Sequence, residues 1–418
     1  FIFAFVLAVG VFRVEPKSTT GNRVLVLLDK EDDKALYSKF FNSLEEREYK
    51  LTYKLPTDST VDLFSYGERA YDHVINFAPK TKSDYYKDKV NPLSLLNFVN
   101  KGGNILLGAS SELSETIRDF AREFDIDFDD IDTSVIDHFN YDISDDGKHT
   151  LIIAKGITNN EAILTKNVIE GPPVLFRGIA HKVGTIPLLT KVLWAGETAY
   201  SYETKADQQV DQEPLVVGNK VMLVSTLQAR NNARVTFVGS TELFSDRFPK
   251  SGNEEFTKDL TKWTFQEKGV LKVTSRHHHK ENETEELEVY RVKDNIIYTI
   301  EISEYVNDHW QAFNGTDVQF EAIMLDPYIR KTLTPLPTSP EQQSRKYKAH
   351  IQLPDVYGVF TFKVNYKRSG YSYIEDSSVV AIRPFRHNEY PRYISAAYPY
   401  YTGAASMIVG FLLFSAIW

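Results

Sequence analysis

Apolar runs separated by amphipathic stretches fill the first third of the chain, and this alternation limits the folds open to it. Residues 22–29 (NRVLVLLD) are almost continuously apolar, as in a parallel strand covered on both faces. Leu36, Phe40, Phe41 and Leu44 then recur at helical spacing. The same exchange of strand and helix patterns continues after them, which predicts an α/β N-terminal region with a parallel sheet.

The pattern changes after residue 125, where strand-like segments follow one another with fewer helices between them. An amphipathic helix at 254–267 is expected to close this part of the chain. Nearly every segment of 289–383 has a strand pattern, with turn residues at short intervals. The predicted units are an α/β region at 22–270, open to division into two lobes near 125–150, a polar linker at 271–288 and a β-sandwich-like domain at 289–392.

The N-terminal end of the sequence is apolar. Phe1–Phe12 is too short to span a bilayer but fits the hydrophobic region of a signal peptide. Ala8, Val9 and Gly10 give the small-x-small pattern of a cleavage site. We therefore predict a signal-peptide remnant and leader over residues 1–21, with a buried strand as the alternative.

The C-terminal end is also apolar. Gly403–Trp418 carries no charge, and at ~1.5 Å per residue it reaches ~24 Å, short of a ~30 Å hydrocarbon core. This favours a truncated transmembrane helix at 396–418, with a buried C-terminal helix as the alternative. Tyr398, Tyr400 and Tyr401 lie where an aromatic belt would meet the membrane interface.

Composition excludes several classes of function. The net charge is −9, which gives no basic signature for nucleic acid. Cysteine is absent, so the chain has no disulfide, thiolate nucleophile or Cys-ligated zinc. No glycine-rich phosphate loop, nucleophile elbow or H-E-x-x-H motif is present, and carboxylates follow the first strand. We predict no catalytic, cofactor-binding or metal-binding residue and no cofactor.

Two polar stretches nevertheless contain residue types that can bind a metal ion. Residues 125–132 (DIDFDDID) contain overlapping D-x-D triplets, which could hold a divalent cation against a sugar diphosphate. A solvated acidic loop is the simpler interpretation and is preferred. His277–His279 could bind a transition metal, but the tract lies in polar sequence and is expected to be an exposed loop.

Residues 135–144 (VIDHFNYDIS) hold Asp137, His138, Asn140 and Asp142 close together. A carboxylate-oriented general base is one interpretation. The same residue types also bond their own backbone in turns, and no nucleophile is marked nearby, so we favour a structural corner or interface.

The stretch LQARNNARV raises a similar choice. It places Arg230 and Arg234 on either side of two asparagines. The two guanidinium groups could clamp an anion. A polar turn leading into the following strand is preferred, which makes both arginines structural or interface candidates.

Four long stretches resemble one family: residues 135–152, 227–246, 353–372 and 395–415. It is the non-catalytic, DDOST-type subunit family of the endoplasmic reticulum oligosaccharyltransferase complex. The resemblance extends from about Asn22 to Trp418. It implies a single-pass type I protein of the endoplasmic reticulum membrane, with most of the chain lumenal.

The resemblance also implies a function and partners. The complex transfers oligosaccharide from dolichyl diphosphate to Asn in N-x-S/T, and its catalytic subunit carries a W-W-D-Y-G signature that is absent here. An N-terminal domain similar to glutamine-amidotransferase-like folds is expected, without the cysteine those enzymes need. Expected partners are the other subunits, including the multi-spanning catalytic one, membrane lipid and the lipid-linked donor, but no nucleic acid.

Two further points follow from the resemblance. The alternative function is a membrane-anchored glycosyltransferase that uses the 125–132 loop with a divalent metal. A lumenal location would expose two sequons to glycosylation, at Asn282 and Asn314.

Overall fold

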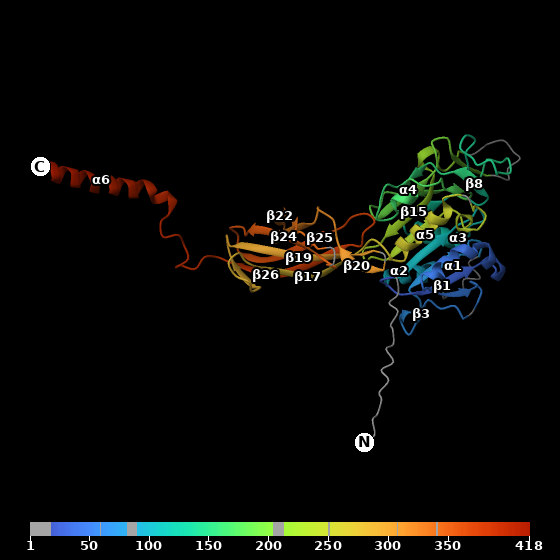
Figure 1. Ribbon diagram of the computed structural model, residues 1–418, viewed down its shortest axis with the longest axis horizontal. Helices are drawn as coiled ribbons and strands as arrows, with labels where there is room; N and C mark the ends of the chain where they lie inside the picture. The colour runs from blue at the N-terminus through green and yellow to red at the C-terminus, as the bar shows by residue number, and fades with distance from the viewer. Residues whose placement is uncertain are drawn as a thin grey trace, which may run out of the picture.

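The protein is described by a computed structural model that places residues 18–58, 60–81, 90–203, 213–249, 251–306, 308–339 and 342–418. An α/β body, a strand-rich domain and a separate C-terminal helix follow one another along the chain (Figure 1). The apolar segment 1–12, for which we predict a signal peptide, lies outside the described residues.

A ten-stranded mixed sheet forms the centre of the α/β body. Its strands are β1 (Arg23–Leu28), β2 (Lys50–Lys54), β5 (His73–Phe77), β6 (Asn104–Gly108), β7 (Ile126–Phe128), β10 (Gly156–Ile157), β12 (His181–Val183), β13 (Leu189–Trp194), β15 (Met222–Gln228) and β16 (Arg234–Val238). Eight of them lie in the order β10-β13-β15-β16-β6-β5-β1-β2. Neighbours from β2 to β16 are parallel, whereas β15, β13 and β10 pair antiparallel. The predicted parallel sheet is thus correct for one half only, because β15 and β16 are joined by a hairpin instead of a helix.

Helices cover both faces of the parallel half. They are α1 (Ser38–Glu46), α2 (Pro92–Asn100), α3 (Glu115–Arg122) and α5 (Asn253–Thr264), with the short α4 (Lys166–Ile169) nearby. Val24 and Val26 of β1 pack in the core that contains α1 and α5 residues, whereas Leu25 and Leu27 pack in the core with α2 and α3. Successive side chains of a strand point to opposite faces, so burial on both sides explains the continuous apolar run of β1.

The region 125–203 does not separate the α/β body into two lobes. It contributes β7, β12, β10 and β13 to the central sheet. The segments between these strands contain short strands that form separate two-stranded sheets outside the central sheet. The paired pieces are β8 (Thr133–Ile136) with β14 (Tyr200–Glu203), and β9 (Ile152–Ile153) with β11 (Leu175–Phe176); earlier in the chain, β3 (Phe64–Ser65) pairs with β4 (Glu68–Arg69).

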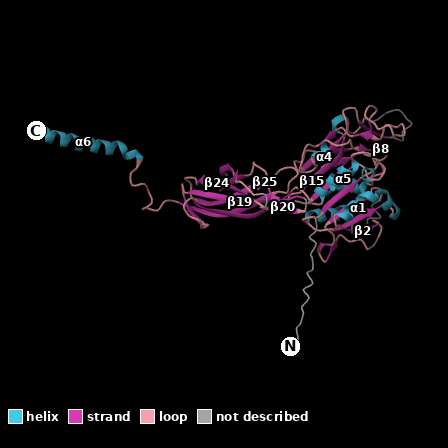
Figure 2. Cartoon of the chain, in the orientation of Figure 1, coloured by secondary structure: helices cyan, strands magenta, loops and turns pink. Residues whose placement is uncertain are grey.

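The second domain packs two five-stranded sheets face to face, and strands dominate it in Figure 2. Its strands are β17 (Val270–Lys280), β18 (Val289–Arg291), β19 (Asn295–Val306), β20 (His309–Ala312), β21 (Gln319–Ile323), β22 (Pro327–Thr332), β23 (Thr334–Pro335), β24 (Arg345–Gln352), β25 (Gly358–Tyr366) and β26 (Ile374–Arg383). One sheet has the order β17-β19-β24-β23 with β20 beside β19, and the other β18-β26-β25-β21-β22. Tyr298 of the first sheet contacts Phe320 of the second, with ring centroids 4.6 Å apart.

The predicted linker at 271–288 is wrong over its first part, because Val270–Lys280 forms β17. This strand pairs antiparallel with β19 almost along its whole length. The polar residues misled the prediction since only one side of β17 faces the core, and polar side chains occupy the other.

The last helix, α6 (Tyr398–Ile417), follows a short 3₁₀ turn and stands apart from both domains in Figure 1. The helical stretch Ser395–Ile417 has a mean hydropathy of 1.6 and is long enough to cross a membrane, and none of it is buried within the protein. Tyr398, Tyr400 and Tyr401 are exposed in its first turn. Among the residues that the structure describes, one C-terminal apolar helix follows a large body, which fits a single-pass membrane protein.

Candidate functional site

Open α/β sheets bind ligands at the carboxyl ends of the strands, where the strand order reverses. Here the reversal lies between β1 and β5, since β2 is on the far side of β1 and β6 on the far side of β5. A crevice of about 480 Å³ opens at this position. Its lining includes Asp29 after β1, Lys80 after β5, Ser110 after β6 and Ser240 after β16.

Several charged groups of this crevice have partners within the protein. Asp29 accepts a hydrogen bond of 3.0 Å from the Thr81 hydroxyl, and burial raises the pKa of the Asp29 carboxyl. Glu242 pairs with Arg247 at 3.0 Å and lies 4.0 Å from Arg177. No histidine is among the described residues that line the crevice, and the chain has no cysteine. The lining is therefore polar and charge-balanced, without an obvious nucleophile and base.

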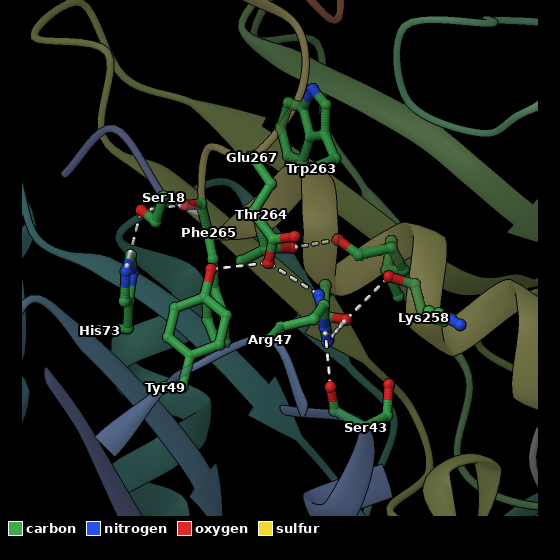
Figure 3. A network of polar contacts seen from close by, with 12 residues as sticks. Ser18, Ser43, Arg47, Tyr49, His73, Lys258, Trp263, Thr264, Phe265 and Glu267 are labelled. Carbon is green, nitrogen blue, oxygen red and sulfur yellow. Dashed lines mark hydrogen bonds and ion pairs between the residues drawn. The ribbon is translucent and has the colours of Figure 1, made fainter. Parts of the chain in front are cut away.

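A second cluster contains a serine, a histidine and an asparagine in an arrangement that resembles a catalytic triad. Ser18 Oγ lies 3.3 Å from Nε2 of His73, and Asn104 Nδ2 lies 3.2 Å from the other ring nitrogen (Figure 3 shows Ser18 and His73). His73 Nε2 is also 3.0 Å from the Gly21 carbonyl, so this nitrogen carries the proton and donates. Ser18 donates to the Phe265 carbonyl at 2.6 Å. Burial lowers the pKa of His73 to about 4, and the ring cannot take a proton from Ser18 in this arrangement.

Figure 3 also shows a buried ion pair that links α1 and the segment after it to the end of α5. Arg47 Nη1 lies 2.7 Å from Glu267 Oε1, and the Tyr49 hydroxyl donates to the same oxygen at 2.6 Å. Arg47 Nη2 donates to the Thr261 hydroxyl at 3.0 Å. Burial, together with the Glu267 charge, raises the pKa of Tyr49 well above its ordinary value. The network forms part of the wall of a cavity of about 580 Å³ between the two domains.

The two domains meet where the loop between β25 and β26 inserts into the α/β body. We call residues 369–373 of this loop the junction loop. Trp263 Nε1 donates to the Gly370 carbonyl at 2.8 Å, and Gln228 Nε2 donates to the Tyr371 carbonyl at 2.7 Å. The Tyr373 amide donates to Asn232 Oδ1 at 2.6 Å. Three elements of the α/β body, α5, β15 and the turn after β15, thus hold one loop of the β domain.

Arg234 fixes the same junction from inside. Its guanidinium is fully buried and donates to the carbonyls of Trp263, Lys268 and Gly269 at 2.7, 2.8 and 2.6 Å. It also lies over the Trp263 ring, 4.5 Å from the centroid. Burial lowers the pKa of Arg234 to about 9, which leaves it protonated near neutrality. Arg230 is exposed, so the two arginines that the sequence paired do not act on one ligand.

The sequence prediction identified Arg234 but missed Trp263, Gly370 and Tyr373. Gly370 has φ of +90°, and a Cβ there would lie 2.8 Å from Cβ of Ala162. The glycine of the KRSGYSY stretch was the available signal, because a glycine in a tight hairpin often marks positive φ or close backbone approach.

We predict that Arg234→Ala lowers the free energy of unfolding by about 3 kcal/mol or more, since each buried carbonyl left unpaired costs about 1–3 kcal/mol. Arg230→Ala is the matched control and should change it by less than about 0.5 kcal/mol. Urea denaturation of the purified full chain measures both. Equal stability of the two variants would contradict the structural role of Arg234.

The stretch at 135–144 forms a corner after β8. Asp137 is buried, and its carboxylate accepts hydrogen bonds from the amides of Phe139 (2.9 Å) and Asn140 (3.1 Å). It also accepts from Asn140 Nδ2 at 3.1 Å and from the Thr198 hydroxyl at 2.7 Å. Burial acts to raise the pKa of Asp137, but these hydrogen bonds outweigh it and the pKa is lowered. Asp142 likewise accepts from the Ser144 amide at 2.9 Å.

The ring nitrogens of His138 contact groups other than the Asp137 carboxylate. Its Nδ1 lies 2.6 Å from Nδ1 of His149, and its Nε2 lies 3.0 Å from the Tyr200 hydroxyl. Asp137 therefore does not orient His138, and the carboxylate-oriented base considered for this stretch is not assembled.

The lowered pKa of Asp137 predicts a contribution to acid stability. In the folded state the pKa of the Asp137 carboxyl lies below its unfolded value of ~3.9. The carboxylate therefore contributes to the free energy of unfolding above pH ~4, and this contribution is lost as the pH falls through the folded pKa. Asp137→Asn should therefore melt at lower temperature than wild type at pH 6–7, and the difference should shrink below pH 4. Asp146→Asn, at an exposed acid of the same loop, is the control. A constant difference from pH 3 to 7 would contradict this assignment.

The D-x-D loop does not gather its carboxylates. Asp125 Oδ2 accepts from the Thr185 amide at 2.8 Å, and Asp127 lies 3.5 Å from Arg122. Asp129 accepts from the Asp130 amide at 2.8 Å. Within the described ranges, no three His, Asp or Glu side chains are placed to hold a metal ion.

The histidine tract is not an exposed loop. His278 is buried in β17, within 2.8 Å of both the Tyr290 hydroxyl and Glu286 Oε1. The prediction failed because alternation along β17 turns the middle histidine of the tract toward the core.

Both sequons lie on the surface of the β domain. Asn282 is exposed just after β17, and Asn314 is exposed between β20 and β21. The Tyr347 hydroxyl lies 2.9 Å from the carbonyls of Phe313 and Gly315, which anchors the backbone on either side of Asn314.

The chain is similar to known proteins over most of its length. Residues 15–267 match the family described as OST48, N-terminal domain, and residues 277–418 match the OST48 middle domain. Proteins named dolichyl-diphosphooligosaccharide–protein glycosyltransferase 48 kDa subunit are 40% identical in Arabidopsis thaliana (100% of this chain, 97% of the relative) and 40% in Drosophila melanogaster (95% and 91%). The Danio rerio protein of that name is 38% identical (94% and 91%). The family resemblance inferred from the sequence is thereby confirmed: this chain belongs to the OST48 family.

Proposed function

We propose that this chain is the 48 kDa-type subunit of an oligosaccharyltransferase complex and acts as its non-catalytic scaffold in the endoplasmic reticulum membrane. The observation that carries the proposal is the match to relatives of that name over nearly the whole chain, which includes both domains and α6. The partners are the other subunits, including the multi-spanning catalytic one. The body lies in the lumen, and α6 anchors it.

Three features support a non-catalytic role. The chain has no cysteine to serve as the nucleophile of the glutamine-amidotransferase-like enzymes whose fold we expect for the N-terminal region. The serine–histidine contact at Ser18 and His73 is bonded in a way that blocks proton transfer. Asp137 and Asp142 accept hydrogen bonds from the backbone of their own corner, which supports a structural role for that stretch.

The junction between the domains supports the scaffold role. The α/β region, proposed at 22–270, and the β domain, proposed at 289–392, are joined through β17 without a flexible linker. The junction loop bonds across the boundary to Trp263, and Arg234 holds the segment that leads into β17, so both contacts oppose hinge motion. Such a rigid body can hold two surfaces at a fixed separation above the membrane.

The crevice at the carboxyl ends of β1 and β5 is our candidate for contact with the lipid-linked donor. Its lining combines carboxylates, guanidinium groups and hydroxyls, so it offers hydroxyl-rich sugars both donors and acceptors. The tyrosines Tyr398, Tyr400 and Tyr401 are proposed to lie at the membrane interface.

The proposed function predicts that the full chain, purified from membranes in mild detergent, recovers a multi-spanning catalytic subunit. A version ending at Ile394 lacks α6 and should be released from membranes by alkaline carbonate when expressed without partners. The chain alone should transfer no sugar with Mn²⁺ or Mg²⁺. Transfer by the isolated chain would instead favour the glycosyltransferase alternative that uses the 125–132 loop.

A lumenal body also predicts glycan at Asn282, Asn314 or both, with Asn314 the better acceptor because Gly315 follows it. Endoglycosidase treatment of the native protein should increase gel mobility, and the Asn282→Gln/Asn314→Gln double variant should show no such shift. The two single variants assign the sites. Unchanged mobility of the native protein would count against lumenal exposure.

A further inference from the structure

The sheet formed by β18, β26, β25, β21 and β22 has an unusual outer face. Side chains of β25 alternate, with Phe360 and Phe362 buried in the core and Val359 and Lys363 pointing outward. Antiparallel sheets with one solvated face normally place polar residues outward. Along β25 and β26, the outward side chains are polar at one end of the face and apolar at the other.

The apolar part of this outer face extends across four neighbouring strands. Val359 of β25 lies opposite Ala381 of β26, which in turn lies opposite Val289 of β18. One step along the sheet, Thr361 has Val379 on one side and Ile323 of β21 on the other. We call Val289, Ile323, Val359, Val379 and Ala381 the apolar end. Val359 and Val379 are 62% and 69% exposed, which is high for valines in the middle of a paired sheet.

The opposite end of the same face is ordinary solvated surface. Lys363 pairs with Glu375 at 2.6 Å, and Asn365 and Ser377 are exposed beside them. The change from valine to charged and amide side chains occurs within single strands, so it is not a property of the whole domain. It marks the apolar end as a bounded patch.

Two ion pairs on the same sheet and at its end border the apolar end. Glu321 lies 2.6 Å from Arg330, and Arg383 lies 2.7 Å from Glu389. An anionic membrane surface attracts clusters of free lysines and arginines, whereas Arg330 and Arg383 each already have a carboxylate partner. An uncharged patch with a neutralised border fits a protein surface that is itself apolar and uncharged.

The position of the apolar end limits which protein could bind to it. β26 ends at Arg383, two residues beyond Ala381, and the chain then continues to α6 at Tyr398. The intervening 384–397 can span at most about 50 Å, at ~3.6 Å per residue. In Figure 1 the chain leaves the β domain toward α6 from the end opposite the α/β body. The apolar end therefore lies at the end of the β domain that leads to the membrane anchor.

We propose that the apolar end is the docking surface for the membrane-proximal lumenal domain of another subunit, which presents an uncharged apolar sheet or helix face. This inference rests on the proposed function, because it requires the chain to belong to a complex. Burial of two exposed valines and their neighbours supplies the apolar centre that such an interface needs. The polar end of the same face remains in water.

The test compares two double variants of the full chain at matched outward positions. Val359→Lys/Val379→Lys places two charges in the apolar end, and Asn365→Lys/Ser377→Lys places two in the polar end of the same strands. After purification in mild detergent, the first should recover other subunits at least tenfold less well than wild type, and the second within twofold. Because all four side chains point outward, thermal unfolding should be similar for both.

A photoreactive residue at position 359, with position 365 as control, gives a readout that does not depend on how the lysine variants fold. A crosslink from 359 to another subunit's lumenal domain supports the proposal. A crosslink to lipid or to a second copy of this chain overturns it, as does normal recovery of subunits by Val359→Lys/Val379→Lys. If the wild-type chain itself recovers no other subunit, the proposed function fails as well.

Discussion

The buried guanidinium of Arg234 is the interaction on which the placement of the two domains depends. A charge removed from water costs several kcal/mol unless hydrogen bonds replace its hydration. Arg234 finds those bonds in the carbonyls of Trp263, Lys268 and Gly269, which lie where α5 ends and β17 begins. The chain that connects the domains is thus shaped around this cation, and the direction in which β17 leaves the α/β body is fixed by it.

The junction loop completes this arrangement from the side of the β domain. Its carbonyls and amides bond to Trp263, Gln228 and Asn232, each of which belongs to a different part of the α/β body. Bonds from several directions oppose both hinge and twist motion. A rigid scaffold binds its partners with less loss of conformational entropy than two domains on a flexible tether. This gives the proposed scaffold role a physical basis in named contacts.

Polar clusters that look catalytic in the sequence are saturated by the fold. Asp137 accepts three hydrogen bonds within its own corner and a fourth from Thr198, and His73 is bonded to the Gly21 carbonyl and to Asn104. Polar groups inside a protein need such partners, and aspartate, asparagine and histidine supply them in turns as well as in active sites. A short cluster of these residues therefore cannot distinguish the two uses until their partners are known.

Local patterns in the sequence were sufficient for the α/β region, the strand-rich domain and the C-terminal apolar helix, because burial on two faces, on one face or in lipid each imposes its own periodicity. The family was likewise readable from four long stretches and was confirmed by comparison. The antiparallel half of the sheet, the pairing of β17 with β19 and the contacts of Arg234 were decided only in the tertiary structure. Each of these depends on segments distant in the chain meeting at one place: an arginine in LQARNNARV gives no sign of whether it faces water, as Arg230 does, or three carbonyls, as Arg234 does. Periodicity is a local property of the chain, whereas the partner of a buried polar group is set by packing between elements, and for that reason only the folded chain could separate the two.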